Sequence, residues 1–256
     1  AVQELARGWK KDPDTLPLLK QLIQFDDRFV RSAAVQELAR GWKKDPDTLP
    51  LLKQLIQSDD DGLVQRAAIQ ELARGWKKDP DTLPLLKQLI QSDDDGLVQR
   101  AAIQELARGW KKDPDTLPLL KQLIQSDDDG LVQRAAIQEL ARGWKKDPDT
   151  LPLLKQLIQS DVDGNVRLAA LEELVQGWKD EPWLFELLYN CTMNDPFQRE
   201  NDWEENPRQM ALEGIIKRYP DHPKTLTLLR DRAENDADEK LREFAQKKLK
   251  QFTQNH

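Results

Sequence analysis

The sequence predicts an all-α protein, a right-handed α-solenoid of two-helix repeats with a period of 34 residues. The segment AIQELARGWKKDPDTLPLLKQLIQSDDDGLVQRA occupies 68–101 and again 102–135, and near-copies occupy 34–67 and 136–169. No stretch shows the alternation of apolar and polar residues that is typical of a half-buried strand. A fixed period of this length indicates an array in which each unit buries its apolar face against its neighbours.

The first helix of a unit is predicted at 82–91, with the sequence TLPLLKQLIQ. Its leucines and isoleucine gather on one face when residues are placed about 100° apart. Asp81 or Thr82 is the expected N-cap. Pro84 then falls in the first turn, where its missing N–H has no intrahelical partner to lose.

The second helix is predicted at 96–108, where small and branched apolar residues form a broad arc. Gly109 is expected to end it in a left-handed C′ conformation, with Trp110 packed back on the last turn. Asp113-Pro114 then prevents the helix from continuing.

Tryptophan marks the register of the repeats. It recurs after each second helix, at Trp9, Trp42, Trp76, Trp110, Trp144 and Trp178. Tyr219 takes the next position 41 residues on, so seven residues are inserted in that unit. Because their units are nearly identical, Trp76, Trp110 and Trp144 are expected to share one environment, substantially buried at the joint between units.

We predict a single domain over 1–256: a partial repeat, 1–7; regular repeats, 8–194; an inserted loop, 195–206; and C-terminal repeats with a charged cap, 207–256. The chain begins within a repeat, with the second helix but not the first. We therefore expect a fragment of a longer array, or an N-terminal end that associates end to end with another molecule. Val2 and Leu5 would then present apolar surface.

The composition limits the class of partner and the compartment. The formal net charge is −7, which argues against a general affinity for nucleic acid or anionic membranes. Cys191 is the only cysteine, so an intrachain disulfide is excluded and a cytoplasmic location is expected. The sequence contains no run of about 18 apolar residues, so no membrane span is expected, and no signal peptide is expected either.

The unit resembles a HEAT-like repeat. The pattern V-R-x-A-A at the start of the second helix is legible at Val30-Arg31 and at Val166-Arg167. A tetratricopeptide repeat would instead carry W-x2-L-G-x2-Y inside its first helix. The resemblance implies a buried Asp–Arg ladder between repeats, but Gln65, Gln99 and Gln133 replace the arginine in the central copies, which puts the ladder in question there.

A second resemblance concerns a segment of the regular repeats and the C-terminal region. The segment GWKKDPDTLPLL and residues 195–249 resemble the C-terminal HEAT-like arrays of cyanobacterial NACHT-type signalling NTPases. This resemblance implies a sensor region. Nothing here matches the phosphate-binding motif G-x4-G-K-[ST], so the chain does not carry the NTPase itself.

The predicted function is a non-enzymatic protein-binding or scaffold module. The candidate site is a polar stripe on the second helices, expected on the concave side: Arg66, Gln70, Arg74, Arg100, Gln104, Arg108, Arg134, Gln138 and Arg142. Rows of arginine can bind carboxylates bidentately, so the expected partner is a protein or an acidic peptide segment. Three alternatives stay open: nucleic-acid binding by the same rows, a solvated face with local pairs such as Glu71–Arg74, and an amplified or engineered scaffold without an evolved ligand.

A second, weaker candidate site is the inserted loop, where Phe197 and Trp203 lie among acidic residues and could anchor a partner. Both rings could equally fold over adjacent helix ends. The repeated acidic turns are Asp59–Asp61, Asp93–Asp95 and Asp127–Asp129. Helix capping explains one aspartate in each better than calcium does, because the EF-hand position for Glu is Gln70.

No catalytic residue, cofactor or metal ligand is predicted. The histidines are His222 and His256, too few with Cys191 for a zinc site. An enzyme such as a HEAT-like bilin lyase is a further alternative, but an active site needs one copy of its residues, and most polar clusters here recur in every repeat.

Overall fold

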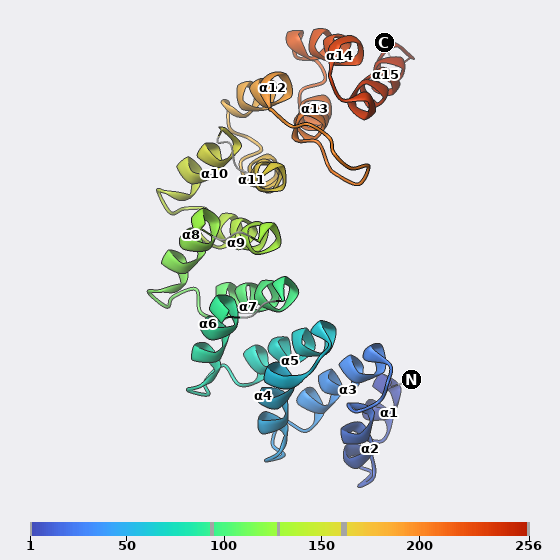
Figure 1. The fold of residues 1–256 in the computed structure, drawn as a ribbon, viewed down its shortest axis with the longest axis vertical. Coiled ribbons are helices and arrows are strands. Elements are labelled where there is room, and N and C mark those ends of the chain that lie inside the picture. The colour runs from blue at the N-terminus through green and yellow to red at the C-terminus, as the bar shows by residue number, and fades with distance from the viewer. Residues whose placement is uncertain (1, 93–94, 127–128, 160–162, 255–256) are drawn as a thin grey trace. The chain divides into compact units, whose positions relative to one another are not determined.

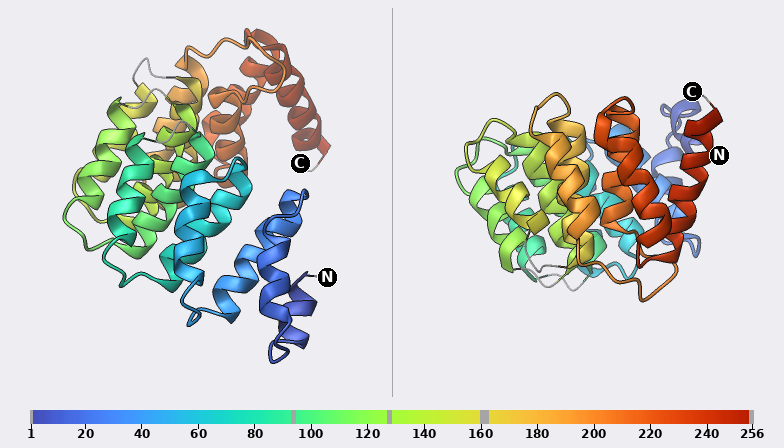
Figure 2. Two further views of the ribbon diagram at one scale, coloured as in Figure 1. Left: turned by 60° about the horizontal axis from the view of Figure 1, so that its bottom comes forward. Right: turned by 90° about the horizontal axis from the view of Figure 1, so that it is seen from above.

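The computed structural model describes residues 2–92, 95–126, 129–159 and 163–254, and every regular element in these ranges is an α-helix. The helices succeed one another as pairs after a single leading helix (Figures 1 and 2). The predicted all-α solenoid of two-helix repeats is therefore confirmed for the described residues. The chain divides into two compact units, residues 1–139 and 140–256. That all of 1–256 behaves as one domain stays a prediction.

The first unit holds the leading helix and the most regular repeats. Its helices are α1 (Val2–Gly8), α2 (Thr15–Leu22), α3 (Arg28–Gly41), α4 (Thr48–Ser58), α5 (Gly62–Gly75), α6 (Thr82–Ser92), α7 (Gly96–Gly109), α8 (Thr116–Ser126) and most of α9 (Gly130–Gly143). Helices α2, α4 and α6 pack on the second helices of their pairs, α3, α5 and α7, and these three second helices pack on one another in turn. The apolar arcs predicted for the two helices meet in this core, where Leu86 and Leu106 are fully buried.

The second unit contains the end of α9, a less regular set of pairs and the inserted loop. Its further helices are α10 (Thr150–Gln159), α11 (Gly164–Gly177), α12 (Leu184–Asn194), α13 (Pro207–Arg218), α14 (Pro223–Asn235) and α15 (Glu239–Gln254). The last helix, α15, packs on α14 and α13 through Leu241 and Ala245, and its charged residues lie toward solvent.

The end of the second helix differs from the prediction. Gly109 is the last helical residue, Trp110 is the C-cap with φ −123°, and no described glycine has a positive φ. The expected left-handed C′ glycine is therefore wrong. The amide of Trp110 donates to the carbonyl oxygen of Leu106 at 2.8 Å, so the helical hydrogen-bond pattern continues through the glycine and needs no left-handed residue.

The start of the first helix is also built differently from the expected N-cap. At α4, Asp47 occupies the N-cap position, but its side chain accepts no helix amide. The hydroxyl of Thr48 donates back to the carbonyl oxygen of Trp42 at 2.9 Å, and Thr82 does the same to Trp76. The threonine thus ties the helix start to the preceding turn.

The central tryptophans do share one environment. Trp76, Trp110 and Trp144 are each half-buried, and the carbonyl oxygen of each accepts a threonine hydroxyl at 2.9 Å. The ammonium groups of Lys43 and Lys77 lie 5.6 Å from the ring centroids of Trp76 and Trp110 respectively. Burial is substantial, as predicted, but it is incomplete because each ring keeps one part in solvent beside a lysine.

Candidate protein-binding surfaces

The predicted stripe on the second helices is brought together on successive helices of the first unit, except Arg142, which belongs to the second unit. Arg66 on α5 and Arg100 on α7 are exposed, whereas Arg134 on α9 is half-buried. The glutamines of the stripe, Gln70, Gln104 and Gln138, are half-buried. The exposed part of the stripe therefore consists mainly of guanidinium groups.

Half of these arginines hold adjacent repeats together. Nη2 of Arg74 lies 3.1 Å from a carboxylate oxygen of Glu105, in the next repeat. Two more pairs have the same spacing along the chain: Arg108–Glu139 at 3.0 Å and Arg142–Glu173 at 2.7 Å. The glutamates are buried, and the side chains of these three arginines remain 52% exposed.

The alternative of a local Glu71–Arg74 pair is wrong. Glu71 accepts two hydrogen bonds, at 3.0 and 2.6 Å, from Arg40 of the preceding repeat. The pairing is therefore between repeats, each arginine reaching forward to the glutamate 31 residues on.

The outward charge of a second helix is positive. Helix α7 carries two arginines and one glutamate as its charged residues, so its formal charge is 2 − 1 = +1. The glutamate, Glu105, is only 5% exposed, whereas Arg100 and Arg108 are exposed. The charged groups that this helix exposes to a ligand in solution are therefore guanidinium groups, although the net charge of the chain is negative.

A second ladder joins the repeats through the first helices. Lys53 of α4 donates to Asp79 at 3.0 Å and to Asp81 at 2.8 Å, both in the turn before α6. Lys20 and Lys87 occupy the same position in their repeats and make the same two contacts. This ladder was not predicted from the sequence; its signal is the recurrence of one lysine with the D-P-D turn of the following repeat.

The third contact between repeats is the Asp–Arg ladder implied by the HEAT-like resemblance. In the second unit, Arg167 binds Asp195 at 2.8 and 3.0 Å and Arg208 binds Asp236 in the same two-pronged way. In the central repeats the amide of Gln99 instead donates to the carbonyl oxygen of Ile90, within its own helix pair, at 3.1 Å. The glutamine that replaces the arginine is therefore bonded within its own repeat.

Capping explains the last aspartate of each acidic turn. The carboxylates of Asp61, Asp95 and Asp129 each accept the amide two residues on, at 2.7–2.8 Å, at the start of a second helix. Asp93, Asp94, Asp127 and Asp128 lie outside the described residues. Asp59 is paired with Arg31 and also accepts the amide of Asp61.

The two aromatic residues of the inserted loop differ. Phe197 is half-buried against Gly164, where an added Cβ would lie 3.4 Å from the ring. Trp203 is 75% exposed. One ring thus folds over a helix start, and the other is presented to solvent.

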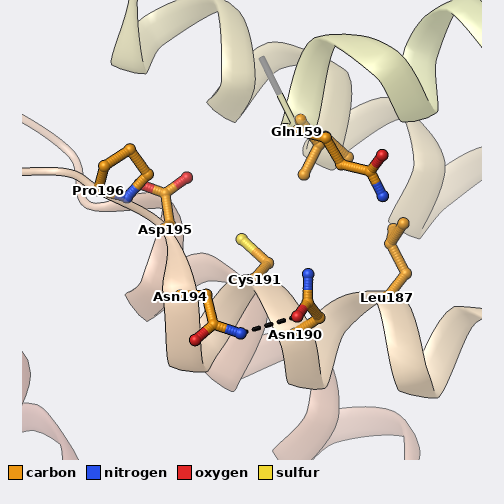
Figure 3. A pocket seen from close by; sticks show the side chains of 8 residues that line it. Gln159, Leu187, Asn190, Cys191, Asn194, Asp195 and Pro196 are labelled. Carbon is orange, nitrogen blue, oxygen red and sulfur yellow. Dashed lines mark hydrogen bonds between the residues drawn. The ribbon is translucent and has the colours of Figure 1, made fainter. Parts of the chain in front are cut away.

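A pocket of about 330 Å³ in the second unit lies between α10 and α12 (Figure 3). It is lined by Cys191, whose thiol lies 3.8 Å from the carbonyl oxygen of Pro207. Burial, reinforced by the negative charge of Asp195, raises the pKa of Cys191 to about 12. The thiol is protonated at neutral pH, and a thiol is a poor nucleophile. In the described ranges no three His, Cys, Asp or Glu side chains are grouped to hold a metal ion.

The N-terminal face carries acidic residues equivalent to those that accept the Arg–Glu and Lys–Asp contacts between repeats. Glu4, Asp12 and Asp14 occupy the positions of Glu37, Asp45 and Asp47 one repeat earlier, and all three are exposed. Trp9 is 59% exposed, and the apolar surface expected at Val2 and Leu5 is only partial, since both are half-buried. End-to-end self-association stays a prediction.

These features define an α-solenoid of two-helix repeats held by charged ladders between repeats. A family model for HEAT repeats matches residues 1–73, 56–141 and 82–175, more than half of the chain, and the chain belongs to the HEAT-repeat family. Proteins of this fold generally mediate protein interactions or act as scaffolds. A comparison with curated proteins found no match. None of the helices described is both long and apolar enough to cross a membrane.

Proposed function

We propose that the chain is a non-enzymatic protein-binding module that takes an acidic segment along the second helices of its first unit. One observation carries the proposal. Arg66 and Arg100 recur at the same helix position, are exposed, and make no ion pair within the described ranges. A guanidinium group that serves no joint between repeats is available to bind a carboxylate.

The neighbouring joint arginines reinforce this surface. Arg74 and Arg108 each donate one hydrogen bond to a buried glutamate, and a guanidinium group has five N–H donors. Each can hold its structural partner and still contribute to the binding of a second carboxylate.

The resemblance of 195–249 to the arrays of NACHT-type NTPases supports a more specific role, the sensor region of such a protein. That role rests on the resemblance alone. In that role, the binding of a ligand segment by the repeats would be transmitted to a separate nucleotide-hydrolysing module.

The test is binding of a fluorescein-labelled (Glu-Ser)8 peptide to the full chain, followed by fluorescence anisotropy. The double variant Arg66→Gln/Arg100→Gln should weaken binding roughly two- to thirtyfold, because each exposed ion pair contributes about 0.2–1 kcal/mol. The variant should also flatten the salt dependence. Arg108 is left intact because Glu139 needs it.

The matched control is Lys78→Gln/Lys112→Gln, which removes the same charge from exposed turn lysines. An equal loss in the control would place the binding surface on the turns and contradict the proposal. If a single-stranded oligonucleotide binds through Arg66 and Arg100 and the peptide does not, the nucleic-acid alternative replaces it.

A further inference from the structure

The inserted loop 195–206 connects α12 to α13 in the second unit and has no regular structure, yet it is tied down along its length (Figure 1). At its start, the buried Arg208 donates to the carbonyl oxygens of Asp195 and Phe197, at 2.8 Å in both cases. At its end, Asn206 donates to Asp238 at 3.0 Å. Both ends are therefore fixed to helices of the same unit.

The tip of the loop is tied down as well. Lys240 donates to the carbonyl oxygen of Asp202 at 2.6 Å, and Arg199 bonds both Asp238, at 2.9 Å, and the carbonyl oxygen of Glu204. The carboxylate of Glu204 accepts the amides of Glu200 and Asn201, and these bonds hold its pKa below the usual value. The residues on both sides of Trp203 are thus fixed.

In the middle of this braced segment Trp203 is 75% exposed. An indole that packed onto the protein surface would bury on the order of 150–250 Å². The hydrogen bonds to Asp202 and Glu204 fix the backbone on both sides of this solvent-exposed ring. An aromatic side chain on a backbone that is already ordered loses less conformational entropy on binding, which is typical of an interface anchor.

The charges around Trp203 indicate which kind of partner would bind. A groove of about 290 Å³ is lined by Asp202 and Glu204, which flank Trp203 in sequence, and by Glu205 and Glu213. Two apolar residues, Leu168 and Met210, line it too, and so do the cations Arg199 and Lys240. Each cation is already paired, with Asp238 and Asp202 respectively, so the groove is acidic: four carboxylates against two cations.

We propose that Trp203 and this groove form a docking site for a lysine- or arginine-bearing segment of a partner protein. A cation of the segment lies on the indole face of Trp203, and a neighbouring one binds Glu205 and Glu213. The aliphatic stem of a basic side chain packs on Met210. Charge complementarity excludes an acidic segment here, so this site is distinct from the guanidinium stripe of the first unit.

The experiment uses the full chain and a fluorescein-labelled (Arg-Ser)4 peptide, again followed by anisotropy. Trp203→Ala should weaken binding roughly two- to thirtyfold, the range expected for a lost cation–π contact. Trp203→Tyr should retain a substantial part of the affinity, because tyrosine also binds cations through its ring. Glu205→Gln/Glu213→Gln should weaken binding and reduce its salt dependence.

The controls match the changes elsewhere on the chain. Trp9→Ala removes another exposed tryptophan, and Glu234→Gln/Glu243→Gln removes two exposed carboxylates; both should bind as the unchanged chain does. The proposal is overturned if the unchanged chain does not bind the peptide, if Trp203→Ala binds equally well, or if the controls lose as much affinity. Arg66→Gln/Arg100→Gln should leave this binding intact, which separates the two proposals.

Discussion

Arg74 in one repeat donates a 3.1 Å hydrogen bond to Glu105 in the next, and Glu105 is only 5% exposed. A carboxylate buried to this extent is costly unless it is paired and hydrogen-bonded. The same relation recurs at the following joint between Arg108 and Glu139. The arginines of the second helices therefore fall into two groups: one joins repeats, and the other, represented by Arg66 and Arg100, does not.

The first prediction distinguishes the two groups by stability. Arg74→Gln should lower the free energy of unfolding by about 1–3 kcal/mol, because Glu105 would keep its buried charge and lose its donor. Arg66→Gln should change it by less than about 0.5 kcal/mol. Urea unfolding followed by circular dichroism measures both. Equal effects for the two variants would mean that the Arg74–Glu105 bond does not stabilise the joint.

The second prediction concerns the buried pair of the second unit. Arg167→Gln reproduces the glutamine of the central repeats, but it leaves Asp195 buried without its guanidinium partner. We expect a loss of about 3–5 kcal/mol in unfolding free energy. Arg167→Gln/Asp195→Asn should recover part of it, because no charge is then left uncompensated. If the double variant is the less stable of the two, the charge of Asp195 is not the cause.

The helices themselves could be predicted from the sequence because their signals are local. The helix predicted at 82–91 corresponds to α6, Thr82–Ser92, and the helix predicted at 96–108 corresponds to α7, Gly96–Gly109. The spacing of apolar residues along a single helix determines which face is buried, whatever the neighbouring repeat does. One local error, the left-handed Gly109, arose because glycine at a helix end is also compatible with an ordinary helical conformation.

The Arg–Glu ladder could not be predicted, because near-identical copies make the pairing ambiguous. Glu71 could pair with Arg74 of its own helix or with Arg40 one repeat earlier, and sequence periodicity does not distinguish these choices. The offset between adjacent helices decides, and that offset comes from packing. The exposure of Trp203 was unpredictable for a similar reason, since it depends on contacts such as Lys240–Asp202 between segments 38 residues apart.

The third prediction concerns the tryptophans at the joints. Trp110 is half-buried, so Trp110→Ala should cost about 1–3 kcal/mol, less than the 3–5 kcal/mol typical of a fully buried aromatic residue. Trp9→Ala should cost less than about 0.5 kcal/mol, because that ring is 59% exposed. Thermal unfolding of both variants provides the comparison. A loss for Trp9→Ala as large as for Trp110→Ala would show that the N-terminal ring is covered in solution.

The last prediction uses pH to test the lysine ladder. Each lysine of the ladder has a pKa above the ordinary 10.5, mainly because it donates a hydrogen bond to an aspartate of the next repeat. The pairs are Lys20–Asp47, Lys53–Asp81 and Lys87–Asp115. A raised pKa in the folded state means that the ladder contributes fully below about 10.5 and loses its contribution as the pH rises through the folded-state value. Stability should therefore fall as the pH rises above about 10.5.

The matched comparison for this pH dependence is Lys20→Arg/Lys53→Arg/Lys87→Arg, because a guanidinium group stays charged across that range. Other groups titrate equally in both proteins, so the difference between their unfolding free energies isolates the ladder. The unchanged chain should lose more stability than the variant on going from about pH 9 to about pH 12. These lysines are partly exposed, so the difference should be small for each pair and visible as the sum of three. Parallel curves would mean that the Lys–Asp bonds are solvated contacts and that the joints depend on the Arg–Glu pairs and the apolar core.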